Sequence, residues 1–156
     1  MNSYGVPVGI SEDWDRPGTM SSSDGKSLGS TGKQVKANSD YAHAHVMPYY
    51  HGDLDEDQTW DYIEPQLQFL NDTVALPGTL ITESQWAWGP NDAHGSHKDS
   101  GIKQYTAYWQ KYDDECELMK SLKTGWFIHD WQGESTFDMV KPDGSYVISD
   151  WKPRKC

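Results

Sequence analysis

The sequence of 156 residues is poor in cysteine, in basic side chains and in long apolar runs. It has 13 lysines and arginines against 24 acidic residues, which gives a net charge of -11. Nucleic acids and anionic membranes both require a basic surface, so this charge excludes them as partners. No run of 18 apolar residues occurs, and the sequence therefore predicts no transmembrane span.

Only two cysteines occur, Cys116 and Cys156. A structural metal framework needs more ligands at closer spacing. The two cysteines form one disulfide if the protein is secreted, and two free thiols are the alternative. The first residues lack the basic start and apolar core of a signal peptide. Either the protein is cytosolic or the chain begins downstream of its true start.

Tryptophan and tyrosine are abundant, with eight and nine copies against three of phenylalanine. Both side chains combine a flat apolar face with a polar edge, which suits contacts with carbohydrate. The alternative interpretation is that these rings form an aromatic core, and a core role for some rings is compatible with carbohydrate contacts for others.

Short apolar segments alternate with segments of helical spacing along the whole chain. This alternation predicts a single α/β domain over residues 1–156, with parallel strands and right-handed crossovers. Residues 18–32 are rich in serine and glycine and predict a surface loop, and residues 91–100 predict a polar loop. Strands are expected at 6–10, 41–47, 79–83 and 126–131. Helices are expected at 56–74, with a kink at Pro65, and at 100–122, and a weak helical signal lies near 34–37.

Each expected strand ends in acidic and aromatic residues. Glu83 ends the third strand, and Trp86 and Trp88 follow it. In (β/α)8 barrels such strand ends line one face, where active sites are built. A carboxylate among tryptophans suits sugar chemistry, because aromatic rings stack on sugars and a carboxylate can attack the anomeric carbon. The alternative is that Glu83 caps the following turn.

Residues 81–86 read Ile-Thr-Glu-Ser-Gln-Trp and resemble the Glu-Thr-Gly-Trp motif of glycoside hydrolase family 17. This family contains β-1,3-glucanases and glucan transglucosylases. There the motif glutamate ends the seventh barrel strand and is the catalytic nucleophile, so the resemblance implies that role for Glu83. Trp86 matches the motif tryptophan, whereas Gln85 replaces the usual glycine.

Three further segments are similar to strands of the same family. Residues 8–14 look like the fifth strand, 44–50 like the sixth and 125–134 like the eighth. In the last segment Asp130 and Glu134 take the places of two family glutamates, while His129, Gln132 and Gly133 depart from the pattern. The resemblance implies a partial (β/α)8 TIM barrel of about four βα units, the C-terminal half of a glycoside hydrolase catalytic domain.

The resemblance implies a retaining β-1,3-glucan hydrolase or transglucosylase that binds β-glucan and needs no metal or cofactor. The family's acid/base glutamate follows Gly-Asn in the fourth strand, and no such motif occurs here. The remaining candidates for a proton donor are Glu12, Asp13, Asp130 and Glu134. The residues expected to bind substrate are Trp14, His45, Tyr49, Tyr50, Trp86, Trp88, Asp130, Trp131 and Glu134.

Other interpretations of the same sequence stay open. The chain could be a carbohydrate-binding half-barrel without turnover, or an inactive fragment of a longer gene product. If the half-barrel is the whole chain, two copies could close an eight-stranded barrel as a homodimer. His43 and His45 share one strand face and could hold zinc with nearby carboxylates, but hydrogen bonding to sugar hydroxyls is the expected role. Family resemblance also implies a secreted or cell-wall protein.

Overall fold

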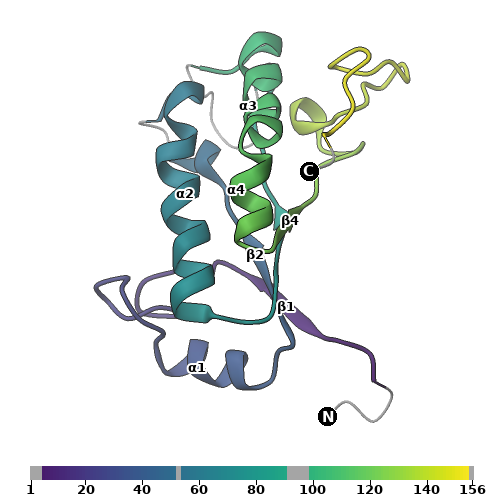
Figure 1. The fold of residues 1–156 in the computed structure, drawn as a ribbon. Helices are drawn as coiled ribbons and strands as arrows, with labels where there is room; N and C mark the ends of the chain where they lie inside the picture. The colour runs from purple at the N-terminus through teal and green to yellow at the C-terminus, as the bar shows by residue number, and fades with distance from the viewer. Residues whose placement is uncertain (1–4, 52–53, 91–98, 155–156) are drawn as a thin grey trace.

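A parallel four-stranded sheet organises the chain (Figure 1). The computed structural model describes residues 5–51, 54–90 and 99–154. The strands follow the chain order β1-β2-β3-β4, and each pairs in parallel with the next. An α/β fold with a parallel sheet is thereby confirmed. The strands are β1 (Gly9–Glu12), β2 (Tyr41–His45), β3 (Thr79–Glu83) and β4 (Thr124–Trp126).

Helices connect successive strands, as the alternating pattern predicted. The connections contain α1 (Ser30–Ala37), α2 (Thr59–Phe69), and the consecutive helices α3 (Ile102–Asp114) and α4 (Cys116–Ser121). A 3-10 turn at Glu56–Gln58 precedes α2, where Asp55 and Gln58 form a capping box. A π-helical turn at Leu70–Val74 continues α2. Two further 3-10 turns lie at Pro48–Tyr50 and Ser135–Phe137.

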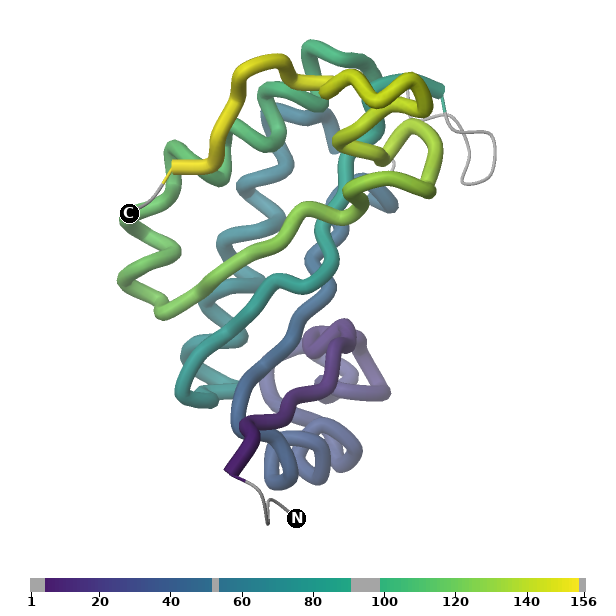
Figure 2. Tube along the Cα trace, turned by 90° about the vertical axis from the view of Figure 1, so that its right-hand side faces the viewer, coloured from purple at the N-terminus to yellow at the C-terminus, as the bar shows by residue number. Residues whose placement is uncertain are grey.

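The core lies between one face of the sheet and the helices α2, α3 and α4 (Figures 1 and 2). Burial alternates along β2, where Ala42 and Ala44 are buried and His43 and His45 are half-buried. This alternation follows from the two-residue period of a strand. The opposite face of the sheet therefore carries the polar side chains. The aromatic core prediction is confirmed by the buried residues of α3, which are Tyr105, Tyr108, Trp109 and Tyr112.

The predicted bounds of three strands were wrong. The first strand begins at Gly9 rather than at residue 6, and the exposed fractions of Val6 and Val8 are 61% and 51%. The second ends at His45, because a 3-10 turn begins at Pro48. The fourth ends at Trp126, and an irregular segment with one 3-10 turn runs to residue 154. As a result, the residues expected at the end of the fourth strand lie on this segment.

The expectation of a surface loop at 18–32 needs correction. Met20, Ser21 and Leu28 are buried, and the segment's last residues already belong to α1. At Gly32 an added Cβ would come within 2.1 Å of the Met20 carbonyl oxygen. Glycine thus allows α1 to lie directly on this connection, which is part of the fold. Most of the predicted polar loop at 91–100, including His94, His97 and Lys98, lies outside the described residues.

Two findings concern the setting of the protein. Cys116 is disulfide-bonded, and the other cysteine of the sequence, Cys156, lies outside the described residues. In the part of the chain that the structure describes, no helix has both the length and the apolar character needed to cross a bilayer.

Candidate active site

Glu83 lies at the carboxyl end of β3 between two imidazole rings. Its Oε2 atom is 3.2 Å from His45 Nε2, and its Oε1 atom is 3.7 Å from His129 Nε2. The Glu83 side chain is 27% exposed, so a ligand can reach the carboxylate from solvent. His45 comes from the end of β2, and His129 comes from the segment after β4.

A register shift in the sheet brings His45 opposite Glu83. Ala44 pairs with Ile81, but the next residue, His45, pairs with Glu83. β3 thus has one extra residue at this point, as in a β-bulge, and bulges redirect side chains near sites of chemistry. Without the shift, His45 would lie opposite Thr82, whose side chain points to the same face as His45.

Hydrogen bonds across three strands hold the His45 ring in place. Its Nε2 atom is 2.9 Å from Ser11 Oγ, and Ser11 Oγ is hydrogen-bonded to Thr82 Oγ1. The opposite ring nitrogen, Nδ1, is 3.6 Å from Asp13 Oδ1. The ring can therefore present a proton to Glu83 in a fixed orientation.

Glu134 lies on the other side of the site. Its Oε2 atom is 3.2 Å from His129 Nε2, the same nitrogen that faces Glu83. Gln85 Nε2 donates a hydrogen bond of 3.0 Å to this oxygen, and the Tyr50 hydroxyl donates one of 2.8 Å to Gln85 Oε1. Burial raises the pKa of Tyr50 to about 12, with further contributions from the charges of Glu134 and Glu83. Tyr50 is thus a neutral donor at physiological pH.

The four candidate proton donors differ in their surroundings. Arg16 contacts Glu12 at 3.1 Å and Asp13 at 2.6 Å, so both carboxylates already take part in ion pairs. The Asp130 carboxylate accepts the backbone N–H of Trp131. Glu134 is linked to Glu83 through a single histidine nitrogen, whereas Asp13 and Glu83 face opposite nitrogens of His45. Glu134 is therefore better placed to act together with Glu83 than Asp13 is.

Three aromatic residues expected to bind substrate lie in the core instead. Trp14, Tyr49 and Trp86 are 1%, 3% and 0% exposed, so they offer no face to a sugar. Trp14 Nε1 donates to the His43 carbonyl at 2.8 Å, and Trp86 Nε1 donates to the Asp99 carbonyl at 3.1 Å. Tyr49 packs edge-on against Trp86 with ring centroids 5.3 Å apart. The loops after the strands fold back, and these rings help fill the core.

Other aromatic side chains remain accessible near the strand ends. Tyr50 and Trp131 are 45% and 55% exposed. The Trp131 ring meets Tyr146 edge-on at 5.8 Å, and Tyr146 is also 55% exposed. Trp88 is half-buried and donates from Nε1 to the Asp138 carbonyl at 3.0 Å. Tyr146 was not among the expected site residues, because it lies far along the chain from every strand end.

Two of the residues at which the sequence departs from the family motifs, Gln85 and His129, contact Glu134. Of the histidines considered for zinc, His43 lies over Gly9, where an added Cβ would come within 3.2 Å of the ring. Within the described ranges, no three or more histidine, cysteine, aspartate or glutamate side chains are grouped so that they could hold a metal ion.

Comparison with known proteins places this arrangement in a known fold. No protein-family model and no curated protein sequence matches the chain. Among solved structures, it is similar to the crystal structure of a glycoside hydrolase family 17 β-1,3-glucanosyltransferase from Rhizomucor miehei, with TM-score 0.59 and 16% identity. An active-site mutant of that enzyme in complex with laminaritriose matches with TM-score 0.62 and 14% identity.

Both matches cover 91% of this chain but only 48% of the neighbour. The chain thus spans about half the length of the solved structures to which it is similar. The resemblance in fold to a family 17 TIM barrel, expected from the sequence motifs, is confirmed, and the chain corresponds in extent to half of such a structure.

Proposed function

We propose that the chain is the C-terminal half-barrel, strands five to eight, of a family 17 β-1,3-glucan hydrolase or transglucosylase of the retaining type, and that Glu83 is the nucleophile. The observation that carries this proposal is the position of Glu83 at the carboxyl end of β3 between two imidazoles, His45 and His129. Active sites of barrels are built at this end of the strands. The fold of the Rhizomucor miehei enzyme supports the same assignment.

In this mechanism the Glu83 carboxylate attacks the anomeric carbon and forms a covalent glycosyl-enzyme. His45 Nε2, 3.2 Å from one carboxylate oxygen, fixes the direction of attack. A carboxylate oriented before the substrate arrives loses little entropy in the transition state. Water or a second glucan chain then attacks the same carbon from the opposite side, which gives hydrolysis or transfer.

Protonation of the leaving oxygen requires a second acidic group. Within the described chain we propose Glu134 for this role, because His129 Nε2 contacts both Glu134 and Glu83. The hydrogen bond from Gln85 Nε2 holds Glu134 toward the site. A proton donor supplied by a polypeptide outside this chain is the alternative.

The proposed substrate is a β-1,3-linked glucan chain or oligosaccharide. The neighbour's complex with laminaritriose supports this choice. The exposed rings of Tyr50, Trp131 and Tyr146 offer apolar faces on which glucose units can stack. We also propose secretion or cell-wall location, because the disulfide at Cys116 requires an oxidising compartment.

A second candidate function is binding of the same glucan without turnover. It is favoured by the ion-pair contacts of the Glu83 carboxylate, which join it to two histidines. The exposed pair Trp131 and Tyr146 could hold a glucan by itself. In this case Glu83 would only accept hydrogen bonds from sugar hydroxyls.

The test measures turnover of two substrates, laminaritriose and a nitrophenyl β-laminaribioside, by the 156-residue chain. The proposal expects Glu83→Gln to reduce turnover of both by about a thousandfold or more. The exposed Glu117 provides a matched control, and Glu117→Gln should leave both rates unchanged. Glu134→Gln should slow laminaritriose cleavage and spare the nitrophenyl substrate, whose leaving group needs no proton.

Absence of turnover with either substrate would defeat the catalytic proposal. If titration calorimetry then shows laminaritriose binding that Trp131→Ala abolishes, the binding function is supported. Turnover that survives Glu83→Gln would refute the assigned nucleophile.

A further inference from the structure

Residues 71–73 read Asn-Asp-Thr, which is an acceptor triplet for N-linked glycosylation. Such a triplet is an asparagine followed, after any residue except proline, by serine or threonine. Of the four asparagines in the sequence, Asn71 is the one that begins a triplet of this kind. Because glycans are bulky and polar, the triplet is a usable site where the fold places its asparagine at the surface.

The triplet lies on the outward side of the π-helical turn that continues α2. Leu70 and Val74, at the two ends of this turn, are buried in the core. Asn71 and Asp72, which lie between them, are exposed. A glycan on Asn71 would therefore extend into solvent without displacing the core residues on either side.

Hydrogen bonds around the triplet fix its backbone and leave its amide at the surface. Lys36 Nζ, from α1, donates to the Thr73 carbonyl at 3.4 Å. Asn71 Nδ2 donates to Asp72 Oδ1 at 2.7 Å, which is a bond between two exposed neighbours. The amide group that would carry the glycan thus lies on a turn whose backbone is held to another helix.

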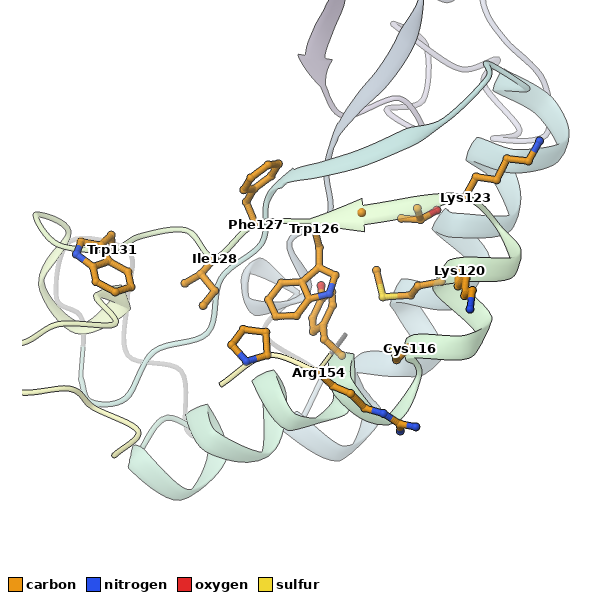
Figure 3. A pocket seen from close by; sticks show the side chains of 13 residues that line it. Cys116, Lys120, Lys123, Trp126, Phe127, Ile128, Trp131 and Arg154 are labelled. Carbon is orange, nitrogen blue, oxygen red and sulfur yellow. The ribbon is translucent and has the colours of Figure 1, made fainter. Parts of the chain in front are cut away.

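The site lies far from Glu83 and away from both edges of the sheet. Residues 75–78 join the turn to Thr79, the first residue of β3, whereas Glu83 is the last residue of that strand. α2 connects β2 with β3, the two inner strands (Figure 1). By contrast, the apolar groove beside β4 lies at an edge of the sheet, where the other half of the proposed barrel would pack (Figure 3). The exposure of Asn71 therefore does not depend on what covers the edges of the sheet.

We propose that Asn71 carries an N-linked glycan. The donor is an oligosaccharide held on a lipid pyrophosphate in the secretory pathway. A bond forms between Asn71 Nδ2 and the anomeric carbon of the first sugar, the bond from that carbon to the pyrophosphate oxygen breaks, and an amide proton passes to a base of the transferase. The inference rests on the proposed secretion, which the disulfide at Cys116 supports, and does not depend on catalysis by Glu83.

The test is translation of the chain behind a cleavable secretion leader in the presence of endoplasmic-reticulum microsomes. Mass spectrometry should find one glycan, on the peptide that contains Asn71, and peptide N-glycosidase should remove it. Asn71→Gln and Thr73→Ala should each lose the glycan, whereas Thr73→Ser keeps the required hydroxyl and should retain it. The matched control, Asn38→Gln, changes an exposed asparagine outside any acceptor triplet and should also retain it.

A second variant shows that transfer to this chain works in the assay. Asp40→Thr combined with Asn71→Gln creates the acceptor triplet Asn-Ser-Thr at residues 38–40 and should carry one glycan on Asn38. An unmodified wild-type chain beside this modified variant would overturn the inference, and so would a glycan that survives Asn71→Gln alone.

Protein isolated from its own source separates this inference from the proposed secretion. Secreted protein should carry the glycan on Asn71. Secreted protein with an unmodified Asn71 would overturn the glycan and leave the secretion proposal intact. Protein confined to the cytosol would refute the proposed secretion and the glycan together.

Discussion

Replacing Ser84 by alanine should destabilise the protein through a buried hydroxyl network. Ser84 is fully buried directly after Glu83, and its Oγ donates to the Val46 carbonyl at 2.7 Å. The same oxygen is hydrogen-bonded to the hydroxyls of Tyr108 and Tyr112, which are also buried. The network therefore joins the ends of β2 and β3 to α3.

The magnitude follows from the groups that lose a partner. In Ser84→Ala the Val46 carbonyl loses this donor, while the two tyrosine hydroxyls, 3.3 Å apart, keep each other. A buried polar group left unsatisfied costs about 1–3 kcal/mol, so we expect a loss of about 2 kcal/mol in the free energy of unfolding. With a urea m-value of about 2 kcal/mol/M, the unfolding midpoint should fall by about 1 M.

The assay is urea unfolding followed by circular dichroism, with an unchanged m-value as the sign of a pure stability effect. Ser121→Ala is the matched control, since Ser121 is exposed and bonds only the nearby Leu118 carbonyl among the described contacts. That variant should lose less than about 0.5 kcal/mol. The reasoning would be refuted by a Ser84→Ala loss no larger than that of the control.

Three further predictions concern the core, the disulfide and the tyrosines. Trp14→Ala should cost about 3–5 kcal/mol, whereas Trp131→Ala should change the melting temperature little, and equal effects would contradict their assigned burial. Cys116→Ala should cost about 2–4 kcal/mol, and reductant should lower the melting temperature of the wild type but not of the variant. Buried tyrosines with raised folded pKa values stabilise the fold fully below their unfolded pKa of about 10, and this stability should be lost as the pH rises toward about 12. An absorbance titration should therefore show them ionising together with unfolding, and simple titration near pH 10 would contradict the assignment; the residues concerned are Tyr105, Tyr108 and Tyr112.

The helices and the third strand could be predicted from the sequence because their signals are local. Apolar residues at helical spacing in α2 and α3 face the core as expected, since the period of the pattern is the period of the structure. Strand 79–83 was bounded correctly because Pro77 and Gly78 mark its start. The end of β4 was not predicted correctly. The length of β4 depends on which carbonyl groups of β3 accept its hydrogen bonds, and this is a property of another segment of the chain.

Part of the candidate site could also be predicted, because some of its signals are local in the sequence. Glu83 and His45 were found because both follow apolar strand residues. The contact between Glu83 and His45 could not be predicted, because it requires a register shift between two strands. Trp14, Trp86 and Tyr49 were misassigned because a ring at a strand end reads the same in sequence whether its loop turns outward or folds back onto the core.

Trapping the glycosyl-enzyme tests the central claim most directly. A 2-deoxy-2-fluoro-β-laminaribiosyl fluoride carries a leaving group that needs no proton donor, so the outcome does not depend on which residue is the acid. Mass spectrometry of the treated and digested protein should find one added fluorinated disaccharide, on the peptide that contains Glu83, and none in Glu83→Gln. A folded, unlabelled wild-type chain, or a label on another carboxylate, would contradict the assignment of Glu83 as the nucleophile.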